Sequence, residues 1–216
     1  MPTAMRRAVV FDVVGTLFSL APVERKLGRV ALEAWFERLL HSATSLTLAG
    51  EFRPFSDLAA STLKTTLAKL GRDVDPSDIL EKLQQLPPQS GAHDAFAALE
   101  RERVLIGTLT NSGAKQTQKL LERAGLEERV TEIVSVEEIE LYKPHPAVYR
   151  HAAQRLGVDP KQVTLIAAHA WDVLGAKAAG FDAVWIDALE REWPFPKGKP
   201  RKAARDLGEA VELALR

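Results

Sequence analysis

The feature that most constrains the fold lies near the start of the chain, where an apolar run from Ala8 to Phe11 ends on a carboxylate, Asp12. β-Branched and aromatic residues are typical of a buried strand, and Gly15 and Thr16 break the run. A charge in such a run costs roughly several kcal/mol unless other groups stabilise it. Open parallel sheets place their sites at the carboxyl ends of strands. Asp12 is therefore a candidate site residue, with a turn or helix-capping aspartate as the alternative.

Beyond Gly91 the chain alternates between helical periodicity and short apolar strands. We predict further strands over 104–109, 130–134, 163–168 and 183–187, the last clear one. We predict helices over 92–102, 114–124, 146–156, 171–179 and 206–215. Apolar strands that alternate with helices predict a parallel sheet covered on both faces. The fold class is therefore α/β, with a Rossmann-like core.

The segment between the first strand and this alternation has a different pattern. Apolar residues recur at helical spacing from 22 to about 50, and two further helices are expected over 58–70 and 76–86. Prolines at 87 and 88 and a glycine at 91 then punctuate the chain. We expect an α/β core formed by residues 1–19 and 89–216, with residues 20–88 inserted as a helical cap.

Composition narrows the classes of partner. The 216 residues carry 29 basic and 29 acidic side chains, so no net field favours a nucleic acid or a membrane surface. There is no cysteine, which removes disulfides and thiolate chemistry, and no apolar stretch is long enough to span a bilayer. We expect a cytoplasmic protein with no nucleic-acid or membrane partner, and a solvated loop at the basic cluster 197–202. Its oligomeric state stays open between a monomer and a homodimer.

Polar side chains follow four of the predicted strands: Asp12 with Thr16, Thr110-Asn111-Ser112, Lys143, and His169 with Asp172. A parallel sheet brings successive strand ends to one edge. A carboxylate can act as a nucleophile, a hydroxyl and an amide can orient it, and a lysine can hold anionic groups together. The pattern predicts a site at this edge in which a carboxylate could form an ester or an acyl phosphate.

Four motifs together resemble the haloacid dehalogenase superfamily over nearly the full chain. They are Phe11-Asp12-Val13-Val14-Gly15-Thr16-Leu17, Leu109-Thr110-Asn111, Lys143-Pro144-His145-Pro146-Ala147-Val148-Tyr149 and Ala167-Ala168-His169-Ala170-Trp171-Asp172. The resemblance implies an aspartate nucleophile, Asp12, which forms a covalent ester with a small anionic substrate that is then hydrolysed. It also implies a cap after the first motif, where the helical segment lies.

Two positions separate the branches of this superfamily. Phosphatases generally have a second aspartate two residues after the nucleophile, where this chain has Val14. They also have an aspartate that helps to hold Mg²⁺ four residues before the last acid, where this chain has Ala168. The sequence looks more like the metal-independent (S)-2-haloacid dehalogenases, which need no cofactor. The alternatives are a Mg²⁺-dependent phosphatase with Asp12 and Asp172 as metal ligands, and a non-catalytic binding protein.

The resemblance also implies roles for individual residues. Asp172 would orient water, Lys143 would steady charge, and Thr16 would support the nucleophile. Substrate contacts would come from Val13, Val14, Thr110, Asn111, Tyr149 and Trp171. The role of His169 stays open between an exposed loop residue, a hydrogen-bond partner of Asp12 or the substrate, and a titrating base.

Three positions depart from the dehalogenase pattern. Phe36 stands where relatives have an arginine that receives the halide, and Arg38 and Arg53 are the nearby candidates to replace it. Ala167 and His169 stand where a serine and an asparagine are usual.

Overall fold

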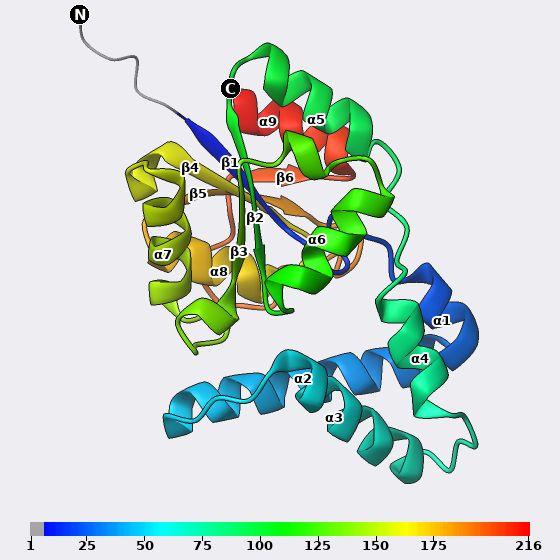
Figure 1. Cartoon of the computed structure of the whole chain (residues 1–216). Coiled ribbons are helices and arrows are strands. Elements are labelled where there is room, and N and C mark those ends of the chain that lie inside the picture. Colours follow the sequence, from blue (N-terminus) through cyan, green and yellow to red (C-terminus); the bar gives the residue numbers. More distant parts are fainter. Residues whose placement is uncertain (1–6) are drawn as a thin grey trace, which may run out of the picture.

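The computed structural model describes residues 7–216 and shows helices on both sides of a parallel sheet (Figure 1). The described chain forms one six-stranded sheet in the order β3-β2-β1-β4-β5-β6. Its strands are β1 (Ala8–Asp12), β2 (Leu105–Thr110), β3 (Glu132–Ser135), β4 (Val163–Ala167), β5 (Asp182–Ile186) and β6 (Lys202–Ala204). Every pairing between neighbouring strands is parallel. The predicted α/β fold class is confirmed.

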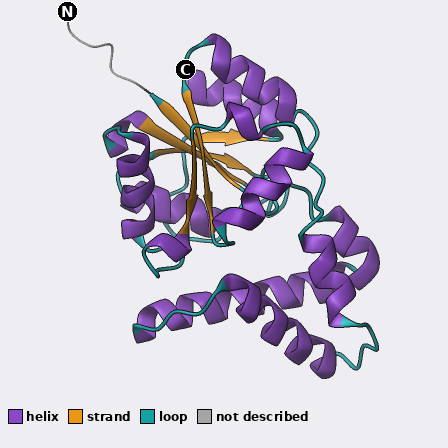
Figure 2. Ribbon diagram, in the orientation of Figure 1, coloured by secondary structure: helices purple, strands orange, loops and turns teal. Residues whose placement is uncertain are grey.

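Helices cover the two faces of the sheet (Figure 2). On one face α5 (Ala92–Arg101) packs against α9 (Leu207–Leu215), and on the other α7 (Pro146–Leu156) packs against α8 (Ala170–Ala178). The remaining core helix, α6 (Ala114–Arg123), lies on β3. Short 3₁₀ helices span Glu127–Arg129, Val136–Glu138 and Pro160–Gln162. These layers bury the strands on both sides, as their apolar composition requires.

The central strand β1 positions the candidate nucleophile. All five of its residues are buried, and β2 and β4 pair on either side of it. The chain runs from β1 to β2 and β3 on one side, and then returns to β4 on the other. The carboxyl ends of β1 and β4 therefore flank the point where the strand order reverses, which is where open α/β sheets bind ligands.

Residues 20–88 contain four helices, α1 (Ala21–Leu27), α2 (Arg29–Ala49), α3 (Phe55–Lys69) and α4 (Pro76–Leu83), which we call the four-helix segment. Helix α2 packs along α3, and α4 contacts α1 and α3 (Figure 1). The stretches of chain that enter and leave this segment are hydrogen-bonded to each other. The Ser19 N–H donates to the Pro87 carbonyl at 2.9 Å, and the Gln89 N–H donates to the Leu17 carbonyl at 2.8 Å.

Direct contacts also hold the four-helix segment against the core. The Tyr142 hydroxyl donates to the Arg53 carbonyl at 2.5 Å, and its backbone N–H donates to the Thr47 hydroxyl at 3.1 Å. The Tyr142 ring also lies 5.1 Å from the Phe52 ring, centroid to centroid. The Arg123 guanidinium donates to a carbonyl at the end of α4 at 2.7 Å.

Two sequence predictions about secondary structure were wrong. The helical run from residue 22 to about 50 is two helices, because Gly28 has a φ of +80°, which an α-helix cannot contain. The sequence also predicts its last clear strand over 183–187, whereas Lys202 to Ala204 add the edge strand β6. That strand is too short for an alternating pattern, and its pairing with β5 and the 2.9 Å contact of Lys202 with Asp182 hold it in place. The preceding basic residues 197, 199 and 201 are exposed, as expected.

None of the helices in residues 7–216 is long and apolar enough to cross a membrane.

Candidate active site

Asp12 ends β1 with its carboxylate almost completely buried among polar partners. The Thr16 hydroxyl donates to Oδ2 at 2.6 Å, and the Lys143 ammonium donates to Oδ1 at 2.8 Å. His169 Nδ1 lies 3.3 Å from Oδ2. Burial disfavours the charged carboxylate, but Lys143 and His169 outweigh burial and hold the pKa of Asp12 well below its usual range. Asp12 is therefore ionised, as a nucleophile must be.

Lys143 joins the two acids of the site. It lies in the loop before α7, yet it is 1% exposed. Its ammonium donates to Asp12, to Asp172 Oδ2 at 2.7 Å and to the Leu109 carbonyl at 3.0 Å, so all three of its hydrogens have acceptors. Burial disfavours the ammonium, but the two carboxylates outweigh this effect and raise the pKa of Lys143 above its ordinary value.

Asp172, in the first turn of α8, is fully buried. Its Oδ1 accepts from the Tyr149 hydroxyl at 2.5 Å, and its Oδ2 accepts from Lys143. Burial raises the pKa of Asp172 above its ordinary value despite the Lys143 charge, and the Asp12 carboxylate adds to the rise. Burial and the Asp172 charge raise the pKa of the Tyr149 hydroxyl well above its ordinary value, so Tyr149 acts as a neutral donor. Both oxygens of Asp172 are therefore occupied.

His169, between β4 and α8, is buried rather than exposed in a loop. Its ring stacks between two aromatic side chains, with centroids 5.4 Å from Phe36 and 5.5 Å from Trp171. Gly15 allows this packing, because a Cβ at that position would lie 2.9 Å from the His169 ring. Phe36 and His169, two of the positions that depart from the pattern implied by the resemblance, are thus stacked on each other.

The turn after β2 supplies the remaining predicted polar groups. The Thr110 hydroxyl accepts from the Ser112 N–H at 3.0 Å, and Asn111 Oδ1 accepts from the Lys143 N–H at 3.1 Å. Neither side chain caps α6, whose N-cap is Gly113. The Asn111 Nδ2 amide is buried and has no partner among the described residues. An unpaired buried donor is available to a ligand.

A small cavity of about 20 Å³, which we call the reaction cavity, lies at these groups. Its lining comprises Asp12, Val14, Phe36, Leu40, Phe55, Thr110, Asn111, Ser112, Lys143, His169 and Trp171. Four predicted site residues are not part of this lining: Val13, Thr16, Tyr149 and Asp172. The Val13 side chain is packed in the core. Thr16 and Asp172 bind the lining residues Asp12 and Lys143, and Tyr149 binds Asp172.

Neither candidate replacement for the missing arginine lines the reaction cavity. Arg53 is exposed and pairs with Glu51 at 3.4 Å on the surface. Arg38 is half-buried on α2 and lines neither this cavity nor the one beside it. Among the described residues, the lining of this cavity thus contains one lysine, Lys143, and no arginine.

The donor set fits Mg²⁺ poorly. Magnesium favours octahedral oxygen ligation, whereas the Lys143 ammonium lies between the two carboxylates that would bind the ion. In residues 7–216 no group of three or more histidines and acids is arranged to hold a metal.

Comparison with known proteins places this geometry in a family. A model of the hydrolase family described as haloacid dehalogenase-like hydrolase matches residues 6–180. The chain belongs to the haloacid dehalogenase-like hydrolases. This hydrolase is 30% identical over 220 residues to (S)-2-haloacid dehalogenase 1 of Pseudomonas sp. (strain CBS-3), with 97% of each chain covered. It is 31% identical over 198 residues to an (S)-2-haloacid dehalogenase of Xanthobacter autotrophicus. That match covers 87% of this chain and 78% of the relative.

Solved structures confirm the fold of this haloacid dehalogenase-like hydrolase. The crystal structure of an L-2-haloacid dehalogenase matches it with a TM-score of 0.93 at 24% identity, over 99% of this chain and 100% of that one. The L-2-haloacid dehalogenase of Xanthobacter autotrophicus, with chloropropionic acid covalently bound, matches with a TM-score of 0.87 at 24% identity. That match covers 98% of this chain and 99% of the other.

Sequence reasoning missed several residues of the site. Leu40 and Phe55 come from the four-helix segment, where helical periodicity identifies apolar residues without showing which of them reach the site. Glu190 accepts from the Ala170 N–H at 2.9 Å, at the start of α8, and burial raises its pKa. Glu190 lies in a loop without a motif, so no local signal identifies it.

Proposed function

We propose that this hydrolase uses Asp12 as a nucleophile on a small anionic substrate and passes through a covalent ester, most like a metal-independent (S)-2-haloacid dehalogenase. The observation that carries the proposal is an ionised, almost completely buried Asp12 carboxylate on the wall of a small cavity, held by Lys143 and Thr16. A preformed, desolvated carboxylate is suited to displacement at carbon. The curated relatives of similar length are named as dehalogenases of (S)-2-haloacids.

In the first step an Asp12 oxygen forms a bond to the substrate carbon, and the halide leaves with the electron pair of the broken bond. No proton needs to be supplied to a halide, which agrees with Val14 at the position where phosphatases have an acid. The free Asn111 amide N–H is the group that would donate to the substrate, and the Lys143 ammonium, whose hydrogens are already donated, would stabilise its negative charges through its own charge. Phe36 presents an apolar wall here.

In the second step water attacks the carbonyl carbon of the Asp12 ester, and the hydroxy acid leaves with the former Asp12 oxygen. The resemblance implies a water-orienting role for Asp172. Both of its oxygens are already bound, one by Lys143 and one by Tyr149, so we assign Asp172 the positioning of the Lys143 ammonium. His169 lines the reaction cavity 3.3 Å from Asp12, so we assign it the exchange of a proton with the attacking water.

Residues 20–88 act as the cap in this proposal. Phe36, Leu40 and Phe55 of the cap line the reaction cavity together with Asp12 and Lys143. A closed cap excludes bulk water, which strengthens the electrostatic contacts in the cavity and protects the ester until the second step.

The test compares wild-type protein with Asp12→Asn on 2-haloacids and on phosphate monoesters, with Mg²⁺ and with a chelator. We expect chelator-resistant halide release that Asp12→Asn lowers by about 10³-fold or more. The matched control is Asp94→Asn, an exposed acid in the first turn of α5, which should retain the wild-type rate.

A single turnover in ¹⁸O-labelled water tests the covalent intermediate directly. Water attacks the ester carbonyl carbon, so the label should enter the Asp12 carboxyl while the product hydroxyl keeps the unlabelled oxygen. Label in the product instead would mean direct attack by water and would overturn the ester. Metal-dependent phosphate release would support the phosphatase alternative, and a folded protein inert on the whole panel would support a binding role.

A further inference from the structure

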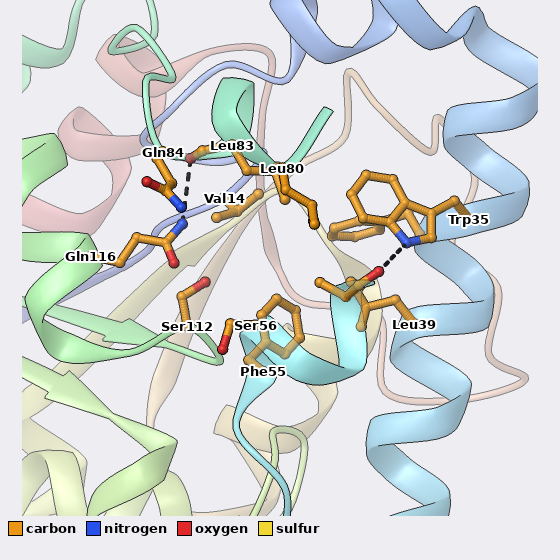
Figure 3. A pocket seen from close by; sticks show the side chains of 12 residues that line it. Val14, Trp35, Leu39, Phe55, Ser56, Leu80, Leu83, Gln84, Ser112 and Gln116 are labelled. Atoms are coloured by element: carbon orange, nitrogen blue, oxygen red, sulfur yellow. Dashed lines mark hydrogen bonds between the residues drawn. The ribbon is translucent and has the colours of Figure 1, made fainter. Parts of the chain in front are cut away.

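A second cavity, which we call the cap chamber, lies beside the reaction cavity and is about 110 Å³ in volume (Figure 3). Four residues line both spaces: Val14, Phe36, Phe55 and Ser112. Figure 3 shows side chains from α2, α3 and α4 around one side of the chamber and Gln116 of α6 on the other. The chamber thus extends the catalytic site between the cap and the core.

The two volumes indicate that the two cavities hold different parts of a substrate. The reaction cavity, at about 20 Å³, has room for little more than one water molecule. An alkyl substituent on a carbon attacked by Asp12 therefore has to lie outside that space. The cap chamber is somewhat smaller than an apolar cavity of about 150 Å³ that binds benzene. It has room for a hydrocarbon group of about four or five carbons.

The lining of the cap chamber selects for an uncharged group. Its cap side consists mainly of apolar side chains, among them Leu39, Ala59 and Leu80. The Trp35 indole N–H is already bound, at 3.2 Å from both the Ala59 carbonyl and the Thr62 hydroxyl, so Trp35 offers its ring alone. At Phe36 the wall between the two spaces is aromatic rather than cationic.

We propose that the cap chamber binds an apolar substituent of the substrate, so that the preferred substrate is a 2-haloacid with an alkyl chain of about four or five carbons beyond the reacting carbon. The inference rests on the proposed function, because it places the reacting carbon at Asp12. The carboxylate and halide then stay beside Asn111 and Lys143, and the alkyl chain passes between Phe36 and Ser112. Each methylene group buried in the chamber strengthens binding about fourfold.

The first measurement is kcat/KM for unbranched 2-bromoacids of two to ten carbons. In wild-type protein kcat/KM should rise about fourfold per methylene group and level off when the chamber is full. Leu80→Trp should fill the chamber and lower the ratio of long-chain to short-chain kcat/KM by about tenfold or more. Leu80→Ala should move the plateau to longer chains. The matched control is Leu70→Trp, at an exposed position outside the chamber, which should keep the wild-type ratio.

The second measurement is calorimetric binding of unhalogenated carboxylates from acetate to octanoate to the same proteins. Longer chains should bind more tightly to wild-type protein and Leu70→Trp, and this gain should vanish in Leu80→Trp. If chain length and Leu80 control binding while no haloacid is turned over, the chamber assignment stands and the proposed reaction falls. If halide release occurs but neither measurement depends on chain length or Leu80, the proposed function stands and the chamber assignment is overturned.

Discussion

At the scale of single residues, Lys143 decides the charge balance of the site. It lies between two buried carboxylates, and removing it would leave Asp172 without a counter-charge and Asp12 with His169 alone. Breaking a buried ion pair from one side is costly because the remaining charges stay desolvated. The same ammonium lowers the pKa of both acids, although burial keeps the pKa of Asp172 above its ordinary value.

Lys143→Met should therefore lower the free energy of unfolding by about 3–5 kcal/mol at neutral pH. Without the ammonium, the folded-state pKa values of Asp12 and Asp172 rise. A carboxyl whose folded-state pKa lies above the unfolded value stabilises the fold at low pH and loses that contribution as pH rises. The deficit should thus shrink as pH falls toward the ordinary carboxyl pKa of 3.8. Urea unfolding at several pH values measures it.

Lys119→Met, an exposed lysine on α6, is the control and should unfold like wild-type protein across this range. A Lys143→Met deficit that stayed constant with pH would mean that the two carboxylates do not carry the destabilisation.

At the scale of elements, the contact between α7 and α8 depends on one glycine. A Cβ on Gly175 of α8 would lie 2.5 Å from the Tyr149 hydroxyl and 2.7 Å from the Pro144 carbonyl. One of these neighbours is backbone, so the helix has to move as a unit. Gly175 thus allows Tyr149 to reach Asp172 across the helix pair.

We expect Gly175→Ala to lower the free energy of unfolding by about 1–3 kcal/mol through overpacking. It should also lower activity, because Tyr149 and the Lys143–Pro144 loop are displaced from Asp172 and Asp12. Thermal unfolding and kcat/KM measure the two effects. Gly208→Ala in α9 is the matched control, since its nearest neighbour is an Asp206 side-chain oxygen at 3.3 Å, and it should be neutral or slightly stabilising. Equal stabilities of the two variants would contradict the close-packing argument.

At the scale of the whole molecule, a few polar contacts hold the proposed cap, residues 20–88, against the core. The N–H of buried Tyr142 depends on the Thr47 hydroxyl, at 3.1 Å, as its acceptor. Tyr142 also reaches the Arg53 carbonyl and packs against Phe52 and Phe55. Loss of one buried acceptor costs about 1–3 kcal/mol for the group left unpaired.

Thr47→Val keeps the shape of the side chain but removes this acceptor. We expect the cap to open more often, so that amide hydrogens over residues 40–55 exchange faster and KM rises severalfold with a smaller change in kcat. Hydrogen exchange with mass spectrometry and steady-state kinetics test this together. Ser45→Ala removes a hydroxyl that bonds only within α2, at 2.8 Å to the His41 carbonyl, and should leave exchange and KM unchanged. Unchanged exchange in Thr47→Val would show that this contact does not hold the cap.

Much of the molecule could be predicted from residue order. Strand–helix alternation predicts the parallel sheet, because these patterns are local and repeat in short windows. Asp12 and Asn111 lie at the carboxyl ends of strands, which a parallel sheet gathers at one edge. Lys143 is buried and binds Asp12 and Asp172, so motif residues that are far apart in the sequence lie together in the fold.

Other features depend on contacts between distant segments. Local sequence could not show that Phe36 and Trp171 enclose His169, that both oxygens of Asp172 are occupied, or that Arg53 faces solvent. A helical pattern identifies an apolar face, but the docking of α2 to α4 on the core selects which side chains reach the reaction cavity and which enclose the cap chamber. Fold class and motif residues thus follow from short-range pattern, whereas the shape of the site follows from long-range packing, whose energy depends on volume and direction in space.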